Sequence, residues 1–350
     1  MRLLFDVNHP VQAHLLRPVV EHFRARGDEC RLVARDKDVT LGLLRSFGLE
    51  ACVPAAVGRG PLGALRELLV REWRLRALAR AFRPAVIAGT SVHAGRVARH
   101  VGAVSVVIND DDAAAVPLFA RLAYPSADWI VTPACLGHER HGARHLTYAA
   151  NQQLFYLHPA RFTPDPGVRA ELGLEPGRCF ALLRLSALEA HHDRGVRGFS
   201  AGLVAAVRAR LPAGWRLFVS SEKPLPPSLA PLALPVPPER MHHALAAAEL
   251  LLGDSQSTTA EAAVLGTPAL RLNDFVGRIS YLADLERRGL AFGFLPGREA
   301  DLLARLEALV SQPSRRAEFA ARRAGLLAET IDPLPWLCAL LERLGAGGRG

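Results

Sequence analysis

The sequence predicts an α/β protein with two doubly wound parallel sheets. Three observations lead to this fold class. Short apolar runs of strand length alternate with segments of helix length along most of the chain, which indicates parallel sheets joined by crossover helices. The 350 residues exceed the size of a usual single core and suit two domains. Polar loops follow several apolar runs, at the strand ends where open α/β sheets bind ligands.

The first domain is expected over residues 1–157. Its first strand is followed by a polar loop at 8–12, and Gly27 ends the next helix. Segment 62–82 repeats leucine at spacings of three or four residues, the pattern of an amphipathic helix. The same patterns predict strands near 3–7, 30–34, 85–88, 104–108 and 129–132, and helices near 14–26, 38–47, 62–82, from about 93, and near 115–123.

The second domain is expected over residues 158–330, after a proline-rich linker that begins near 156. Its expected strands lie near 179–185, 215–220, 234–236, 249–253, 268–272 and 291–295. Its expected helices lie near 199–210, 239–248, 257–265, 280–288, 299–310 and 314–328. The last segment, 331–350, is expected to form a helix that packs back on the first domain before a flexible glycine-rich end.

The composition narrows the class of protein. Half of the residues are hydrophobic, and the apolar runs are too short to predict a membrane span. The chain enters a strand directly after Met1-Arg2, which argues against a secretory signal. Its five cysteines are scattered without a CxxC pair, which favours a reducing compartment and argues against a structural zinc site. We therefore expect a cytoplasmic protein.

The net charge of +9 comes mainly from arginine. A basic surface attracts nucleic acid, anionic lipid or a phosphorylated substrate. Nucleic acid is the weakest of these, because no known binding motif is present and aromatic residues are few. The basic side of helix 62–82 is interpreted as a solvated face, with peripheral contact at the inner face of the membrane as the alternative.

Segment 250–272 organises the second domain. An apolar strand stops at Gly253, hydroxyl residues follow, and a helix carries Glu261 before the chain resumes as a strand. Free N–H groups and the helix dipole at such a helix start favour phosphate. An ordinary helix cap explains the same serine and threonine residues equally well.

Two further polar loops are expected beside this helix start. One closes a strand with Arg184, and the other closes the next strand with Ser221 and Glu222. An arginine, several hydroxyls, a helix N-terminus and a carboxylate suit a nucleotide diphosphate and its ribose. Neither GxGxxG nor GxxxxGK[ST] occurs, which disfavours a dinucleotide-binding protein or a P-loop kinase. The proposed ligands are Arg184, Ser186, Ser221, Glu222, Met241, Asp254, Ser255, Ser257, Thr258, Thr259 and Glu261.

The first domain offers a general base. His14, near the start of a helix, and Asp111, in the acidic loop 110–112, are the best-placed candidates. Capping or packing explains His9 and His93 when each is taken alone. The acidic triplet is also typical of a solvated helix start, and no matching His or Glu spacing supports a metal. His191-His192-Asp193 is interpreted as a polar loop or a lid.

Four stretches of the sequence resemble a family of predicted glycosyltransferases, an uncharacterised domain family of archaea and bacteria. They are FDVNHPVQAHLLRPVVEHFRARG, YLHPARFTPDP, LRLSALEAHHDRGVRGFS and GDSQSTTAEAAVLGTPALRLNDFVGRISYL. That family is similar to the GT-B superfamily, which includes UDP-N-acetylglucosamine 2-epimerase. The resemblance implies two Rossmann-like domains, a nucleotide-sugar held mainly by the second domain, no cofactor and no required metal.

The resemblance also implies roles for residues. Ser255 to Thr259 would hold the diphosphate, Glu261 the ribose, Arg184 and Ser186 the phosphate side, and the segment near Met241 the base. The epimerase pattern is incomplete: its Asp is replaced by Thr90, its Glu by Asp110, and a further acid is missing near Leu118. Epimerisation is therefore disfavoured.

We therefore expect a glycosyltransferase that moves a hexosyl or N-acetylhexosaminyl group from a nucleotide-diphosphate sugar, UDP-linked by expectation, to a lipid-linked or polysaccharide acceptor. An epimerase-like or hydrolytic nucleotide-sugar enzyme and a non-catalytic nucleotide-sugar binding protein are the alternatives.

Overall fold

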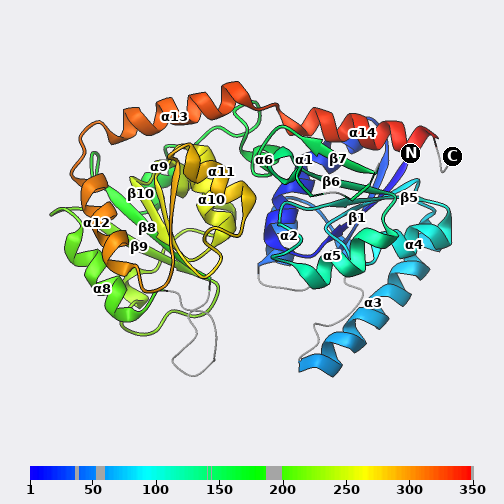
Figure 1. Cartoon of the computed structure of the whole chain (residues 1–350), viewed down its shortest axis with the longest axis horizontal. Helices are drawn as coiled ribbons and strands as arrows, with labels where there is room; N and C mark the ends of the chain where they lie inside the picture. The colour runs from blue at the N-terminus through cyan, green and yellow to red at the C-terminus, as the bar shows by residue number, and fades with distance from the viewer. Residues whose placement is uncertain (36–38, 53–59, 140, 143, 187–198, 348–350) are drawn as a thin grey trace. The chain divides into compact units, whose positions relative to one another are not determined.

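The computed structural model describes all residues except 36–38, 53–59, 140, 143, 187–198 and 348–350. The chain divides into two compact units (Figure 1). Unit 1 contains Met1–His158 together with Ile331–Gly350, and unit 2 contains Pro159–Thr330. Each unit holds one sheet whose strand pairs are all parallel. The predicted α/β class is confirmed.

Unit 1 is built on a seven-stranded sheet in the order β3-β2-β1-β4-β5-β6-β7. Strand order reverses between β1 and β4, so this sheet has a topological switch point there. The central strands are buried on both faces, which explains their continuous apolar runs. The strands are β1 (Arg2–Val7), β2 (Glu29–Ala34), β3 (Ala51–Cys52), β4 (Val86–Gly89), β5 (Val104–Ile108), β6 (Trp129–Pro133) and β7 (His145–Tyr148).

Helices cover both faces of this sheet (Figure 1). One face carries α1 (Pro10–Ala25), α2 (Thr40–Ser46), the short α6 (Leu154–Leu157) and the C-terminal α14 (Pro333–Gly347), which packs on α1. The other face carries α3 (Gly60–Phe82), α4 (Ala94–Val101) and α5 (Pro117–Ala123). Leu75, Ala79 and Phe82 fix the end of α3 in the core beneath α4.

Unit 2 has a five-stranded sheet in the order β12-β11-β10-β8-β9. Its switch point lies between β8 and β10, because the chain runs outward from this pair in both directions. The strands are β8 (Phe180–Leu185), β9 (Arg216–Ser221), β10 (Leu250–Gly253), β11 (Ala269–Leu272) and β12 (Ala291–Phe294).

The helices of unit 2 also form two layers. α8 (Ala201–Arg210) packs with α12 (Glu299–Val310), while α10 (Gln256–Leu265) contacts α9 (Met241–Ala247), α11 (Ser280–Arg287) and α13 (Arg315–Glu329). The short α7 (Val168–Glu171) lies against α9.

Two short strands were not predicted, and one predicted strand is wrong. β3 and β7 have two and four residues, too few for a periodic signal. Segment 234–236 is not a strand, and only one bridge, from Ala233 to Val219, forms beside it. Pro235 and Pro237 have no backbone N–H to donate, so they prevent a ladder at this position.

One apolar helical stretch, Arg315–Gly347, passes a length and composition test for a membrane span. It consists of two helices of 15 residues, α13 and α14, which belong to different units. A 15-residue helix rises about 22 Å, less than the ~30 Å hydrocarbon core of a bilayer. Neither helix alone has the length to cross it.

Candidate functional site

The switch point of unit 2 brings two of the predicted loops into direct contact. β8 and β10 run in register with Gly253 opposite Arg184. A side chain at Gly253 would place its Cβ 2.3 Å from the carbonyl oxygen of Arg184, so only glycine fits. Asp254, which follows, accepts hydrogen bonds at Oδ1 from the backbone N–H and the hydroxyl of Ser186, at 2.7 and 2.8 Å. The two loops are therefore locked together at the carboxyl ends of their strands.

The third predicted loop joins them through Arg184. Its guanidinium donates to the hydroxyl of Ser220 at 2.8 Å and to the carboxylate of Glu222 at 3.0 Å. The neighbouring Ser221 hydroxyl accepts the N–H of Lys223. The arginine is mostly buried and its charge is balanced by Glu222. An anionic ligand would therefore have to share this arginine with Glu222.

The helix α10 begins directly after this junction, with Ser255 as its N-cap. The Ser255 hydroxyl accepts the N–H of Thr258, and the Thr259 hydroxyl donates to the Ser255 carbonyl oxygen at 2.7 Å. Thr258 and Thr259 are buried, whereas Ser255 and Ser257 are half-buried. The groups of the predicted phosphate site that stay accessible are therefore the Ser257 hydroxyl and the first N–H groups of the helix. Ser255 and Thr259 form the helix cap, whereas Ser257 is left for an anion.

Glu261 lies one and a half turns into α10, with only 5% of its surface exposed. Its Oε1 is 3.2 Å from Nε2 of His242, which is equally buried on α9. The ring of Phe162 packs edge-on against His242. Met241 begins α9 one residue earlier. The sequence contains two adjacent histidines, His242 and His243, and the rotation of α9 about its axis decides which of them faces Glu261.

The Asp254 carboxylate has a second notable feature. It is buried, yet its Oδ2 atom has no hydrogen-bond partner among the described residues. A buried carboxylate oxygen is costly to leave unpaired. Beside a helix start that favours phosphate, this oxygen is suited to accept a hydrogen bond from a ligand hydroxyl.

Unit 1 has a corresponding polar junction at its own switch point. The side-chain amide of Asn8, after β1, donates to the Thr90 carbonyl oxygen after β4. The Thr90 hydroxyl donates to the Ile108 carbonyl oxygen at the end of β5. Gly89 has φ +143° and lies against the backbone of Asp6, which excludes any side chain there. Hydrogen bonds from side chains to backbone carbonyls therefore hold the loops together just before the helix α1 begins.

The candidate base His14 lies within the second turn of α1 and is packed between rings. Its imidazole stacks on Tyr156 with 5.4 Å between ring centroids and meets Phe47 edge-on at 5.2 Å. The ring is only partly covered. Packing therefore orients His14, and the base role stays a prediction. His9 caps α1, as its alternative interpretation proposed.

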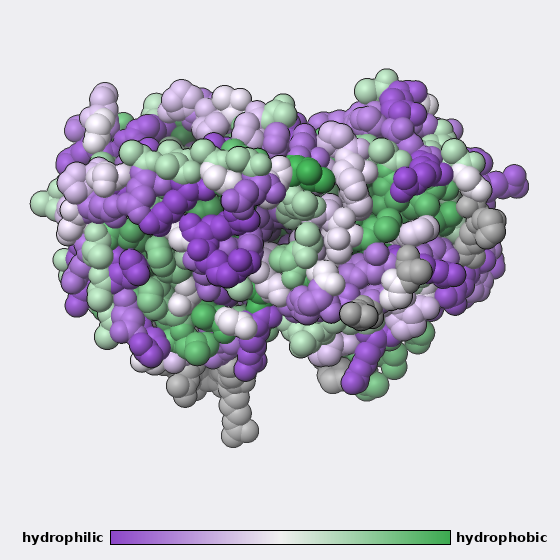
Figure 2. All heavy atoms as spheres, turned by 45° about the horizontal axis from the view of Figure 1, so that its top comes forward, coloured by the Kyte–Doolittle hydropathy of each residue, from purple (hydrophilic) through white to green (hydrophobic). Residues whose placement is uncertain are grey.

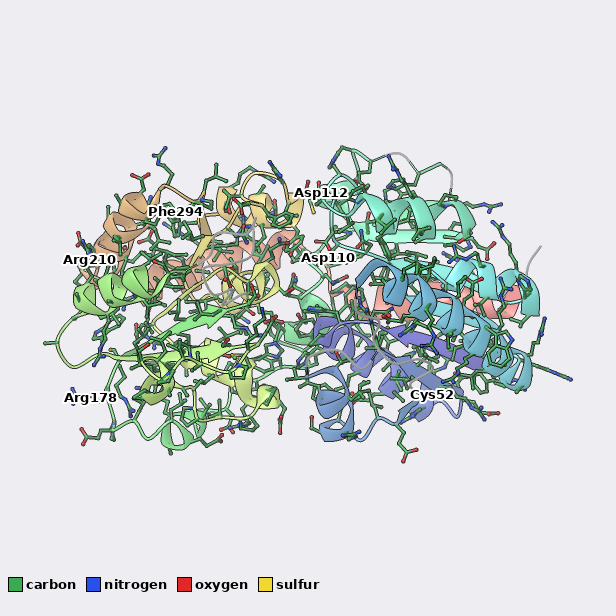
Figure 3. The ribbon with its side chains drawn as sticks, turned by 90° about the horizontal axis from the view of Figure 1, so that it is seen from below. Cys52, Asp110, Asp112, Arg178, Arg210 and Phe294 are labelled. Carbon is green, nitrogen blue, oxygen red and sulfur yellow. The ribbon has the colours of Figure 1, made fainter. Side chains whose placement is uncertain are left out.

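The acidic loop after β5 holds carboxyl groups with raised pKa values. Burial raises the pKa of Asp110 well above its usual range, and the charge of Asp111 adds to this, while the side-chain amides of Gln152 and Gln153 oppose it. Burial, together with the charge of Asp112, raises the pKa of Asp111 to about 6. Asp112 is buried, Asp110 and Asp111 are half-buried, and the next helix begins only at Pro117, so the triplet is not the solvated helix start that the sequence also allowed. Figure 3 shows Asp110 and Asp112 at this loop.

A potential cation-binding set lies beside the acidic loop. Asp112, His138 and Glu139 each place one ligand atom within 4.8 Å of the others, and this is the one such group found in the described part of the chain. Nδ1 of His138 lies 3.1 Å from the Cys135 carbonyl oxygen, so Nε2 is directed away from that bond. Glu139 already accepts the N–H of Ala113 and pairs with His141. Sequence spacing did not indicate this set, because Asp112 and His138 are far apart along the chain.

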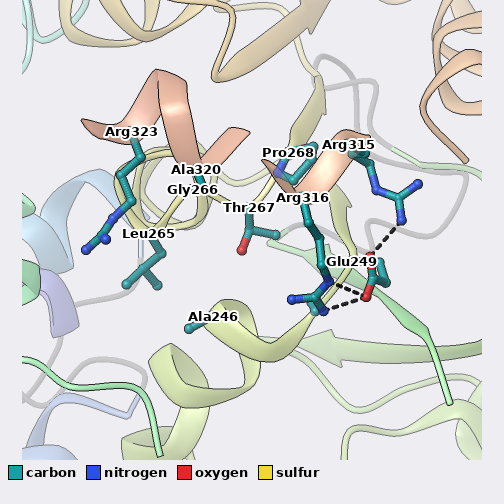
Figure 4. Close-up of a pocket in the computed structure, with 11 residues that line it drawn as sticks. Ala246, Glu249, Leu265, Gly266, Thr267, Pro268, Arg315, Arg316, Ala320 and Arg323 are labelled. Atoms are coloured by element: carbon teal, nitrogen blue, oxygen red, sulfur yellow. Dashed lines mark hydrogen bonds and ion pairs between the residues drawn. The ribbon is translucent and has the colours of Figure 1, made fainter. Parts of the chain in front are cut away.

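Unit 2 also contains a pocket of about 190 Å³ away from the loops described above (Figure 4). Glu249 and Pro268, which line it, immediately precede β10 and β11, so it lies at the amino ends of the strands. Glu249 binds Arg315 at 2.6 Å and Arg316 at 2.7 Å. This ion-pair cluster joins α13 to the sheet at the edge opposite the candidate nucleotide loops.

The polar segment His191-His192-Asp193, interpreted from the sequence as a polar loop or a lid, lies outside the described residues.

Comparison with solved structures places this architecture in a known class. The chain has the GT-B fold. It is similar to UDP-GlcNAc 2-epimerase from Neisseria meningitidis bound to UDP-GlcNAc, with a TM-score of 0.70 and 14% identity over 98% of this chain and 99% of that one. It is also similar to the spinosyn forosaminyltransferase SpnP, with a TM-score of 0.62 and 20% identity over 99% of both chains.

A third similar structure is the glycosyltransferase VinC in complex with dTDP, with a TM-score of 0.60 and 17% identity over 99% of this chain and 100% of that one. No protein-family model and no curated protein sequence matches the chain. Because identities are this low, the solved structures establish the fold, and the residues must support any assignment of activity.

Proposed function

We propose that the protein is a glycosyltransferase that takes a sugar from a nucleotide-diphosphate donor, UDP-linked by preference, and transfers it to a hydroxyl of a lipid-linked or polysaccharide acceptor. The observation that carries this proposal is the junction at the switch point of unit 2. Ser186, Asp254 and the start of α10 meet there, where open α/β sheets bind their ligands.

The donor would bind through groups of different chemistry. The diphosphate lies at the start of α10, where free N–H groups and the Ser257 hydroxyl favour an anion. Arg184 supplies positive charge beside it. Glu261, oriented by His242, accepts the ribose hydroxyls. The segment at Met241 approaches the nucleobase.

Transfer breaks the bond between the anomeric carbon and the diphosphate oxygen and forms a bond to the acceptor oxygen. The leaving diphosphate keeps the electron pair and is stabilised by the helix start and Arg184. The acceptor hydroxyl loses its proton to a base of unit 1, for which His14 and Asp111 are the candidates. The protein itself needs no cofactor for this chemistry, because the donor is the substrate.

Membership of the uncharacterised predicted-glycosyltransferase family is part of this proposal and is supported by the four sequence stretches that resemble it. An epimerase-like or hydrolytic reaction is the second candidate, supported by the fold similarity to UDP-GlcNAc 2-epimerase. Thr90 replaces an acid of that enzyme class, and its hydroxyl is committed to the Ile108 carbonyl. Transfer therefore fits the residues better.

The test has two steps. Purified protein is first screened by thermal shift against UDP-, dTDP-, GDP- and ADP-sugars, and a stabilising donor identifies the nucleotide. Products are then followed by NMR with that donor, first alone and then with membrane or glycan extracts. Turnover that requires an extract supports transfer, while turnover without one supports the second candidate. Tight binding with no turnover in either case would make the protein a binding protein, and no binding to any donor would remove the proposal.

A further inference from the structure

The helix α3 exposes an apolar stripe that its own unit does not use. Leu62, Leu65, Leu69 and Trp73 are 84%, 53%, 61% and 70% exposed, four of the nine exposed large hydrophobic side chains of the described chain. The sequence predicted an amphipathic helix here, with an apolar side and a basic side. The structure shows instead that Leu75, Ala79 and Phe82, nearer the end of the helix, make the core contact.

The exposed stripe lies on the side of the helix opposite the core contact. At 100° per residue, Leu62, Leu69 and Trp73 fall within about 40° of one another, while Leu75, Ala79 and Phe82 face the other way. Figure 1 shows α3 extending from its unit. Figure 2 shows hydrophobic residues beside hydrophilic ones along the lower edge of the surface.

The charges of α3 are sorted between the same two sides. Both acids of the helix are engaged: Glu67 binds Arg35 at 2.6 and 2.8 Å, and Glu72 binds Arg76 and Arg96. Arg66, Arg74 and Arg80 are exposed. The outward side of the helix therefore carries leucines, a tryptophan and arginines, with no exposed acid.

We propose that the outward side of α3, defined by Leu62, Leu65, Leu69 and Trp73, docks on an anionic lipid surface. Leucine and tryptophan side chains partition into the boundary between headgroups and acyl chains, and arginines flanking them attract anionic headgroups. The absence of an exposed acid on α3 makes the charge complementary to such a surface.

This geometry also corrects the interpretation of the basic residues. Arg71, which a membrane contact through a basic face would use, is only 3% exposed and forms an ion pair with the fully buried Asp6. The docking side is apolar in its centre, with the arginines as flanks. Charge reversal at Arg71 would disrupt the core and would not test docking.

The experiment compares vesicle binding of the whole chain with that of a variant carrying Leu62→Gln, Leu69→Gln and Trp73→Gln. Vesicles of phosphatidylcholine alone and vesicles containing phosphatidylglycerol are used in a flotation assay. The matched control is Leu118→Gln, which removes another leucine of unit 1 that is 70% exposed but lies on α5. The wild type and the control should bind the anionic vesicles, and the triple variant should bind them at least roughly tenfold more weakly.

Further readouts make the result decisive. Tryptophan fluorescence should shift to the blue on anionic vesicles in the wild type and not in the triple variant, which lacks Trp73, and binding should weaken with salt. Unchanged vesicle binding by the triple variant would overturn the proposal, as would concentration-dependent self-association of the wild type that the variant abolishes. The inference does not rest on the proposed function, because docking needs no donor. The triple variant should keep the nucleotide thermal shift of the wild type, so failure of either proposal is seen separately.

Discussion

Replacing Glu261 by glutamine should weaken nucleotide binding sharply while leaving the fold intact. The carboxylate is 5% exposed and lies 3.2 Å from Nε2 of His242, so its orientation is fixed before a ligand arrives. Hydrogen bonds to a charged group contribute about 1.5–3 kcal/mol each. Glutamine has nearly the same shape but carries no charge and has one acceptor oxygen. Loss of one such bond to the ribose corresponds to a roughly 10–150-fold rise in Kd.

The assay is isothermal titration with the nucleoside diphosphate that gives the largest thermal shift. The matched control is Glu249→Gln, a buried glutamate of the same unit at the opposite edge of the sheet. It should lower the melting temperature without changing Kd. If Glu261→Gln binds the nucleotide within twofold of the wild type, Glu261 does not hold the ribose and the donor orientation proposed above is wrong.

Three other substitutions test the framework around the site. Arg71→Met leaves the buried carboxylate of Asp6 without its arginine and should cost about 3–5 kcal/mol of unfolding free energy in unit 1. Arg80→Met on the same helix should change that free energy little, and equal urea midpoints for the two variants would contradict the burial argument. Burial alone would raise the pKa of Glu249, but the two arginines bound to it outweigh burial and lower that pKa. The ionised Glu249 therefore stabilises the protein above the ordinary pKa, and this stabilisation is lost as pH falls through the folded value. The difference in melting temperature between wild type and Glu249→Gln should accordingly shrink in acid. Gly253→Ala places a methyl group against a backbone carbonyl and should separate β8 from β10, with a loss of roughly 1–3 kcal/mol and weaker nucleotide binding; an unchanged Kd would show that this junction is not part of the donor site.

The fold class was predictable from the sequence because the central strands of both sheets are short apolar runs, each ended by a polar residue or a glycine. Parallel strands buried on both faces need such runs, so the pattern and the topology have the same cause. The failures lie at edges. β7, with His145 and Thr147, pairs on one side only and carries little apolar signal. Segment 234–236 had the apolar residues of a strand, but its prolines remove the donors that pairing requires.

The sequence predicted which loops form the candidate site, but it did not predict which side chains contact each other there. Arg184 lies at the end of one strand, and Ser186 and Asp254 follow two neighbouring strands, which was enough to bring them together because parallel strands end at one edge. The pairing of Glu261 with His242 depends on how α9 and α10 are rotated against each other. Periodicity does not decide that rotation when a helix such as α10 is buried almost all round.

Helix α3 shows that helical periodicity predicts a helix without predicting which of its leucines are buried. Its leucines recur at helical spacing over 23 residues, and a solvated helix needs only one apolar side. Leucines on two sides of one helix cannot all be buried by a single sheet face, and the core contact through Leu75 leaves the other side in solvent. Leucine and tryptophan side chains that stay 53–84% exposed gain little hydrophobic stabilisation from folding. Burial of these side chains would stabilise a complex only with an apolar partner, and the arginines beside them are the reason we propose an anionic lipid surface as that partner.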